Sequence, residues 1–96
     1  MKNLHYFRTI WSCGKYDKST SSAIMYNLIA GYSFFFEDVS ADVIGDILKC
    51  KRGEKIDINE IINKNNVDKE TLENFFDLLM QYGLVDTNPS NYDKIE

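Results

Sequence analysis

Tyr32-Ser33-Phe34-Phe35-Phe36-Glu37 is the stretch that decides the fold of this 96-residue chain. It is short and aromatic, it is rich in residues that favour strands, and it contains neither proline nor glycine. Ala30-Gly31, just before it, is typical of a turn, and an earlier apolar run occupies Ala23 to Ile29. We therefore predict two antiparallel strands joined by a tight loop.

The two faces of the aromatic strand differ in character, because successive side chains of a strand point to opposite sides. One face holds Tyr32, Phe34 and Phe36, and the other holds Ser33, Phe35 and Glu37. The face with three aromatic side chains needs to be covered by helices. The opposite face carries a single large aromatic side chain.

After the aromatic strand the apolar residues recur with a period near 3.6, which predicts helix as far as Gly83. Three N-terminal signals combine a capping residue with flanking apolar residues that form a hydrophobic staple. The signals are Val39-Ser40 with Ile44, Ile56-Asp57 with Ile61, and Val67-Asp68 with Leu72. The predicted helices are Ala41 to about Arg52 ended by Gly53, a short second helix closed by Asn65-Asn66, and Lys69 to about Tyr82 ended by Gly83.

Outside these elements the sequence predicts two short strands and a loop. Leu4 to Ser12 favours a strand by composition, with a short amphipathic helix as the alternative. Gly14 to Ser22 has loop composition, and Leu84-Val85 is a brief final strand. The fold class is therefore α+β and winged-helix-like, a three-stranded antiparallel sheet followed by three helices. One domain over residues 1–88 and a polar tail over residues 89–96 are expected.

The composition and net charge of the chain limit the classes of function to be considered. Hydrophobic residues make up 44% of the chain and charged residues 27%, and the formal net charge is −4. An acidic chain is a poor binder of nucleic acid, which requires basic surface. The N-terminal segment is locally basic, and we interpret it as solvated, with docking to an acidic partner as the alternative.

Residues that carry chemistry are few and scattered. Cys13 and Cys50 have no metal-ligand spacing and His5 has no cysteine nearby, so we predict no metal and no cofactor. There is no phosphate loop and no nucleophile motif, so we predict that the protein is not an enzyme. We interpret both thiols as reduced, with a single disulfide as the alternative. No signal peptide or membrane span is evident, and a cytoplasmic location is expected.

An unprotected edge strand and a helix with a widened apolar face together suggest peptide binding. Edge strands are usually blunted by proline or lysine, whereas residues 32–37 contain neither. In the third helix Phe75, Leu78 and Tyr82 extend the apolar face toward a second flank. We interpret Phe34, Phe36, Leu72 and Leu79 primarily as core.

The chain resembles the PqqD family, the RiPP recognition elements that act as small chaperones of ribosomally made, post-translationally modified peptides. The resemblance rests on the aromatic strand running into Ser40-Ala41 and Ile44 to Leu48, and on a closing element from Leu78 to Val85. It covers about residues 4 to 87. The long polar loop of residues 14–22 and the density of phenylalanine in the strand depart from the family pattern.

The resemblance implies a function and a site. Such a domain binds the leader segment of a precursor peptide as an added strand and presents the peptide to a modifying enzyme, often a radical SAM enzyme. Carried onto this sequence, the strand from Ser33 to Glu37 faces the third helix. The implied peptide-binding residues are Ser33, Phe34, Phe35, Phe36, Glu37, Phe75, Leu78, Leu79 and Tyr82.

Two other functions remain as alternatives. A winged-helix DNA-binding regulator requires a basic or amide-rich recognition helix. The third helix instead carries four acidic residues (Asp68, Glu70, Glu73 and Asp77) against Lys69. A generic protein–protein adaptor, which recognises no leader, is the other alternative.

Overall fold

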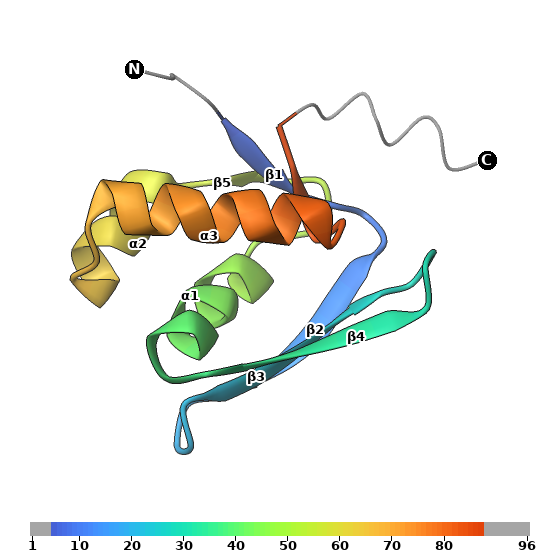
Figure 1. The fold of residues 1–96 in the computed structure, drawn as a ribbon, viewed down its shortest axis with the longest axis horizontal. Helices are drawn as coiled ribbons and strands as arrows, with labels where there is room; N and C mark the ends of the chain where they lie inside the picture. Colours follow the sequence, from blue (N-terminus) through green and yellow to red (C-terminus); the bar gives the residue numbers. More distant parts are fainter. Residues whose placement is uncertain (1–4, 88–96) are drawn as a thin grey trace.

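Residues 5–87 of the chain are described by a computed structural model, drawn in Figure 1. Residues 1–4 and 88–96, and with them Leu4 and the predicted polar tail 89–96, lie outside the described residues. In chain order the elements are β1 (Tyr6–Arg8), β2 (Ser12–Asp17), β3 (Ser22–Asn27), β4 (Tyr32–Glu37), α1 (Asp38–Lys49), β5 (Lys55–Ile56), α2 (Ile58–Asn65), α3 (Lys69–Gln81) and β6 (Val85–Asp86). The class is α+β, as predicted.

The predicted hairpin is confirmed as β3 and β4. The two strands pair antiparallel from Ser22 opposite Glu37 to Asn27 opposite Tyr32. The loop between them is held by the Asn27 side chain, whose oxygen accepts hydrogen bonds from the backbone N–H groups of Ile29 and Ala30, each at 3.0 Å. An asparagine oxygen satisfies turn N–H groups in this way because its short side chain reaches the backbone two or three residues ahead.

Where the sequence predicts one three-stranded sheet, the described residues form two. One has the order β2-β3-β4 and the other the order β5-β1-β6. The predicted first strand, Leu4 to Ser12, corresponds to the three residues of β1, which lie in the second sheet rather than beside the hairpin. Strands of two or three residues leave almost no periodicity in a sequence, and their pairing partners are distant along the chain.

The predicted loop from Gly14 to Ser22 is wrong over most of its length. β2 continues to Asp17 and pairs with β3 over six residues, which leaves residues 18–21 as the turn. β2 lacks an alternating apolar pattern, so its sequence does not indicate a strand. Its one aromatic side chain, Tyr16, packs directly on Gly45 of α1, where an added Cβ would lie 2.5 Å from the ring.

The two ends of α1 also differ from the prediction. Ser40 is not the N-cap, because α1 already begins at Asp38 after Glu37, and no side chain caps its first turn. The helix ends at Lys49 rather than near Arg52. Gly53 does have a positive φ of 82°, but it lies in the following turn, where its N–H donates to the Arg8 carbonyl at 2.7 Å.

The caps predicted for α2 and α3 are confirmed. The Asp57 side chain accepts a hydrogen bond from the Glu60 N–H, and the Asp68 side chain accepts one from the Thr71 N–H. Asn66 closes α2 in the left-handed conformation. These signals are local in sequence, which is why they could be predicted without knowledge of the fold.

The predicted end of α3 at Gly83 is confirmed in detail. Gly83 has a φ of 76°, and the Leu84 N–H donates to the Leu79 carbonyl at 2.9 Å. The Gly83 N–H donates to the Met80 carbonyl at 3.0 Å. This pair of bonds is the Schellman motif, and it turns the chain into β6.

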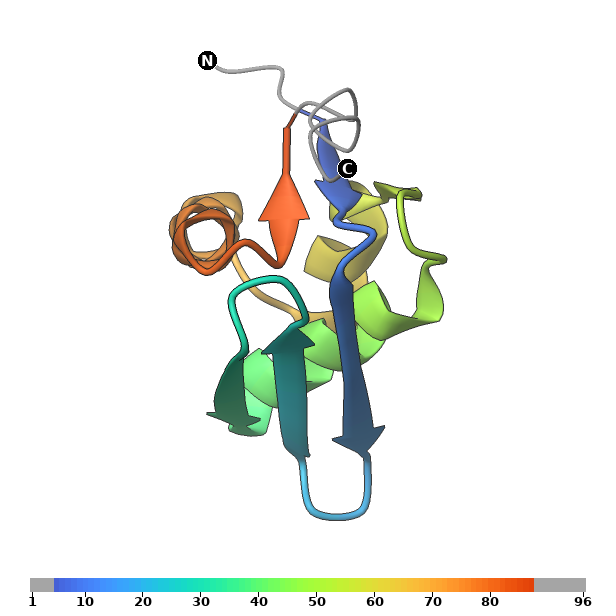
Figure 2. The same cartoon turned by 90° about the vertical axis from the view of Figure 1, so that its right-hand side faces the viewer.

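The core lies between the hairpin sheet, the helices and the short sheet. α1 covers one face of the β2-β3-β4 sheet (Figure 2). The centre is formed by side chains that are completely buried, among them Met25, Ile44, Ile47, Phe76, Leu79 and Leu84. Tyr6 of β1 meets Phe76 edge to face, with ring centroids 4.8 Å apart. α3 therefore belongs to the same core as the short sheet.

Candidate functional site at an open strand edge

β4 is an edge strand with one side unoccupied. Within residues 5–87 it pairs with β3 and with no other strand. In Figure 2 it lies on the same side of the molecule as α3. Nothing in its sequence protects the edge, since it contains neither lysine nor proline. An edge of this kind offers backbone hydrogen bonds to another extended chain.

The register identifies which backbone groups point outward. The Asp38 N–H donates to the Ser21 carbonyl at 2.8 Å, and the Leu28 N–H donates to the Trp11 carbonyl at 2.9 Å. Hydrogen-bonded and non-bonded pairs alternate along an antiparallel ladder. The first bond continues the β3–β4 ladder, so Phe36, Phe34 and Tyr32 direct their backbone groups toward β3. The second bond continues the β2–β3 ladder and shows that alternate residues of β3, including Asn27 and Met25, face β4, which gives the same result. The N–H and C=O groups of Ser33, Phe35 and Glu37 point to the open side.

The inner face of β4 is joined to α3 by aromatic pairs. Phe34 stacks on Tyr82 with ring centroids 4.1 Å apart, and Phe36 meets Phe75 edge to face at 5.8 Å. Burial along this face falls steadily, since Phe36 is 8% exposed, Phe34 is half-buried and Tyr32 is 65% exposed. The aromatic face predicted to be covered by helices is thus covered at one end only.

Two hollows flank these aromatic pairs. A hollow of about 390 Å³ lies at the start of β4, between Tyr32 and Phe34 on one side and Gln81 and Tyr82 on the other. A smaller one of about 160 Å³ lies beyond the end of β4 and is lined by residues of both α1 and α3, including Val39, Val43, Thr71 and Phe75. We call the surface between β4 and α3, with these two hollows at its ends, the edge groove.

The sequence-predicted site residues fall into three groups in the structure. Those that line the edge groove are Phe34, Phe75 and Tyr82, with Leu78 exposed on α3. Those on the outer side of β4 are Ser33, Phe35 and Glu37. Those in the core are Phe36 and Leu79. Leu79 has no exposed surface and belongs to the core cluster.

Several groove residues were not predicted. Tyr32 shares a face with Phe34, so the period of two already indicated it. Gln81, Val39 and Thr71 carry no signal in the sequence, because only the packing of α1 and α3 brings them to the hollows. Asn27 lines the larger hollow and is buried.

Asn27 fixes the end of the groove by joining the hairpin to α3. Its side-chain amide donates to the Tyr82 carbonyl at 3.0 Å, while its oxygen holds the hairpin loop. Trp11 Nε1 donates to the neighbouring Gly83 carbonyl at 2.7 Å. The last turn of α3 is thereby held at a set distance from the start of β4.

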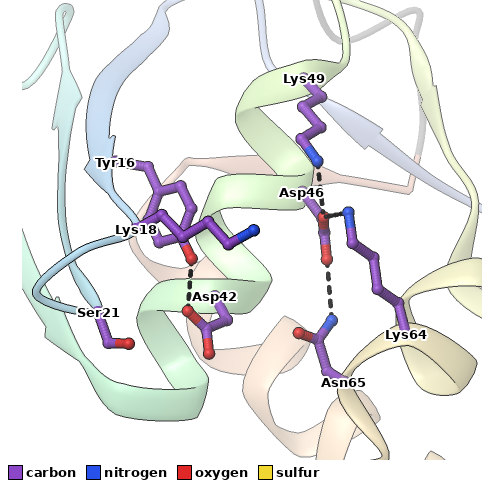
Figure 3. Close-up of a pocket in the computed structure, with 8 residues that line it drawn as sticks. All are labelled: Tyr16, Lys18, Ser21, Asp42, Asp46, Lys49, Lys64 and Asn65. Atoms are coloured by element: carbon purple, nitrogen blue, oxygen red, sulfur yellow. Dashed lines mark hydrogen bonds and ion pairs between the residues drawn. The ribbon is translucent and has the colours of Figure 1, made fainter.

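A third, polar hollow of about 290 Å³ lies between the β2–β3 turn, α1 and α2 (Figure 3). Asp46 of α1 is at its centre: Oδ1 lies 2.9 Å from Lys64 Nζ and 3.6 Å from Lys49 Nζ, and Oδ2 accepts from Asn65 at 2.8 Å. Nearby, the Tyr16 hydroxyl donates to Asp42 at 2.5 Å. We interpret this cluster as a structural connection between α1 and α2, because its charged groups already satisfy one another.

This connection should make stability depend on pH. Burial opposes ionisation of Asp46, but the bonds from Asn65 and Lys64 outweigh it and lower the pKa of Asp46. A carboxylate with a lowered pKa in the folded state stabilises the protein above its unfolded pKa, and this contribution is lost as the pH falls through the folded value. We expect Asp46→Asn to lower the free energy of unfolding by about 1–2 kcal/mol at pH 7.

The measurement is urea denaturation of the wild type and Asp46→Asn at pH 7 and again at pH 3. The difference between the two proteins should shrink at pH 3, because this pH lies below the ordinary pKa of an aspartate and the unfolded chain then takes up a proton. A difference that is the same at both pH values would show that the charge of Asp46 contributes nothing.

Other kinds of site have little support in the described part of the chain. No three His, Cys, Asp or Glu side chains within residues 5–87 come together to hold a metal ion. No helix in that range is long and apolar enough to cross a bilayer. Cys13 and Cys50 are both free thiols, and burial raises the pKa of Cys50.

Comparison with known proteins finds no similar protein. The chain matches no protein-family model, no curated protein and no solved structure. The functional argument therefore depends on the edge groove itself.

Proposed function

We propose that this domain binds the leader segment of a ribosomally synthesised precursor peptide and presents the peptide to a modifying enzyme, such as a radical SAM protein. The leader adds as a strand along the open edge of β4 and places alternate side chains in the edge groove. The domain itself binds and does not catalyse. The observation that carries the proposal is an open strand edge whose outward backbone groups lie beside an apolar groove.

The two parts of the site have complementary roles in such binding. Backbone groups of Ser33, Phe35 and Glu37 supply affinity for any extended chain, and the groove selects side chains. Sites of this kind obtain most of their affinity from a few anchor side chains rather than from contact area. The partly exposed Phe34–Tyr82 pair and the two hollows supply places for such anchors.

The order of elements supports the same proposal. A hairpin leads into α1, and α2 and α3 follow with a short turn between them. We interpret this as a winged-helix-like arrangement in which α3 lies beside the open strand instead of entering a DNA groove. The resemblance to the PqqD family agrees with this placement of the strand and the helix.

The direct test is a titration of the ¹⁵N-labelled domain with synthetic leader segments of precursor peptides encoded near its gene, followed by backbone NMR. Strand addition should shift the amide signals of Ser33, Phe35 and Glu37 and of Asn74 to Tyr82 on α3. Shifts confined to the N-terminal basic segment would instead favour an adaptor that recognises no leader.

Phe35→Lys is expected to weaken leader binding by about three- to tenfold while leaving the fold intact. Phe35 is 64% exposed on the outer face of β4, so its replacement removes apolar contact with an added strand but creates no cavity. Titration of the variant checks binding, and thermal unfolding checks the fold. If the variant unfolds, Phe35 contributes to the core and the outer face is not part of the site.

A further inference from the structure

The register of β4 dictates which residues of an added strand enter the edge groove. Residues of the added strand that lie opposite Ser33, Phe35 and Glu37 share their outer face, because paired residues of a sheet point to the same side. Residues opposite Tyr32, Phe34 and Phe36 point toward α3. Only every second residue of the added strand therefore reaches the groove.

The distance between the two hollows sets the spacing of the anchors. On α3 and its C-cap the larger hollow is lined by Gln81 and Tyr82 and the smaller one by Thr71, Leu72 and Phe75, so the middle of the larger lies near Gln81 and the middle of the smaller near Leu72. Nine residues of helix separate them, which is about 14 Å at about 1.5 Å per residue. An extended chain covers this distance in four residues, at about 3.4 Å each. Four is an even number, so both anchors face the groove, whereas a spacing of three or five directs one of them outward.

The space between the hollows is already filled. The Phe34–Tyr82 stack and the Phe36–Phe75 pair close the floor there. The hollows themselves are lined mainly by apolar side chains and contain no lysine or arginine. The anchors that fit them are therefore uncharged and apolar.

The charge beside the groove is negative at one end. Glu37, which is exposed, ends β4 next to the smaller hollow, and the exposed Asp38 follows it. The Cβ atom of an added-strand residue opposite Glu37 lies about 5 Å from the Glu37 Cβ atom on the outer face. Opposite charges in such a pair are favourable and like charges are not. The site therefore favours an added strand with a lysine or arginine at this position, adjacent to the anchor that fills the smaller hollow.

On these grounds we propose that the edge groove selects an extended segment with two large apolar side chains four residues apart and a basic residue beside the anchor near Glu37. This selectivity rests on the proposed function, since it assumes strand addition along β4. It states which leader segments the domain accepts.

The test uses synthetic twelve-residue peptides with a serine- and threonine-rich background, labelled with a fluorophore. Each carries two leucines at a spacing of three, four or five residues, with lysine or glutamate beside either leucine. We expect a spacing of four to bind at least about tenfold more tightly than a spacing of three or five. We expect lysine beside the correct leucine to bind about threefold more tightly than glutamate, an advantage that 0.5 M NaCl should abolish.

Two variants assign the anchors to their hollows. Tyr32→Ala opens the larger hollow at an exposed side chain, and Val39→Ser alters the smaller one at another. Each should reduce the preference for a spacing of four without unfolding the domain. Glu37→Gln should remove the preference for lysine and leave the preference for spacing.

The outcomes separate this selectivity from the proposed function. If the peptides shift the Ser33, Phe35 and Glu37 amides but bind equally at every spacing, the selectivity is overturned and strand addition stands. If none of these peptides binds while an encoded leader shifts the same amides, the selectivity is likewise overturned. If neither the peptides nor an encoded leader shifts those amides, the proposed function itself fails.

Discussion

Arg8→Met is expected to lower the free energy of unfolding by about 3–5 kcal/mol, since it removes a buried cationic donor from several acceptors. Arg8 is only 8% exposed. Its guanidinium donates to the Leu48 and Cys50 carbonyls at the end of α1, at 3.3 and 2.6 Å, and to the Ser12 hydroxyl and carbonyl, each at 3.2 Å. Methionine keeps much of the apolar volume and leaves those carbonyls without this donor.

The position of Arg8 at the end of a helix adds to the expected loss. The last carbonyls of a helix carry partial negative charge, which a nearby cation stabilises. Burial lowers the pKa of Arg8, but guanidinium starts so high that it stays charged at any working pH. The same side chain joins β1 and β2 to α1, so its loss loosens the connection between the two sheets.

Chemical denaturation of the wild type, Arg8→Met and a matched control checks this expectation. Arg52→Met is the control, because Arg52 is exposed and donates only a long bond of 3.4 Å to the Ile10 carbonyl. The control should lose less than about 0.5 kcal/mol. Arg8→Lys should recover only part of the loss, since one ammonium group cannot reproduce a planar fork of donors. A loss below about 1 kcal/mol for Arg8→Met would refute the role of the guanidinium.

Arg8 also illustrates what the sequence could not reveal. In the sequence it is one basic residue of an N-terminal segment interpreted as solvated, whereas in the structure it is buried against the end of α1. Two of its acceptors, the Leu48 and Cys50 carbonyls, are backbone groups about forty residues away along the chain. Every residue carries a backbone carbonyl, so no sequence pattern can indicate which of them accept a hydrogen bond from Arg8.

The predictions that succeeded rest on signals within a few residues. The caps of α2 and α3, the stop at Gly83 and the β3–β4 hairpin each depend on short-range chemistry. The failures depend on distant contacts. β2 was missed because its stability comes from pairing with β3 and from Tyr16 packing on Gly45, neither of which is visible as a period in residues 12–17.

The start of α1 failed for a related reason. Ser40 is preceded by an apolar residue and followed by a suitable staple partner, so the local signal was sound. The chain instead enters the helix directly from β4, with Asp38 at a φ of 59° and its N–H bonded to the Ser21 carbonyl. Pairing with the β2–β3 turn thus overrides the local capping preference.

The candidate site was predicted in part by the same rule. The period of two correctly divided β4 into an aromatic face and a face with Phe35 alone, and the wide apolar face of α3 indicated Phe75, Leu78 and Tyr82. The hollows at the two ends were not predictable, because they arise where residues from α1, α3 and the hairpin meet. Their positions are a property of packing, whereas the alternation of β4 is a property of the backbone.

Ser33→Pro is expected to reduce leader binding by at least about tenfold, because it removes an outward backbone donor and places a ring in the path of an added strand. Ser33 is exposed and its N–H points to the open side, so the β3–β4 ladder loses no hydrogen bond. Proline is tolerated on edge strands for this reason. Peptide titration by fluorescence anisotropy measures the loss, and thermal unfolding monitors the fold.

Two matched variants make this a test of register as well as of binding. Ser33→Ala keeps the N–H and should bind leader like the wild type, so it separates loss of the donor from loss of the hydroxyl. Phe34→Pro applies the same change one residue further along, where the N–H points to Met25 of β3, and it should disrupt the hairpin and unfold the domain. Equal leader affinity for Ser33→Pro and Ser33→Ala would mean that no chain adds along β4. Unfolding of Ser33→Pro with a folded Phe34→Pro would mean that the inward and outward residues of β4 are the reverse of those inferred from the ladder.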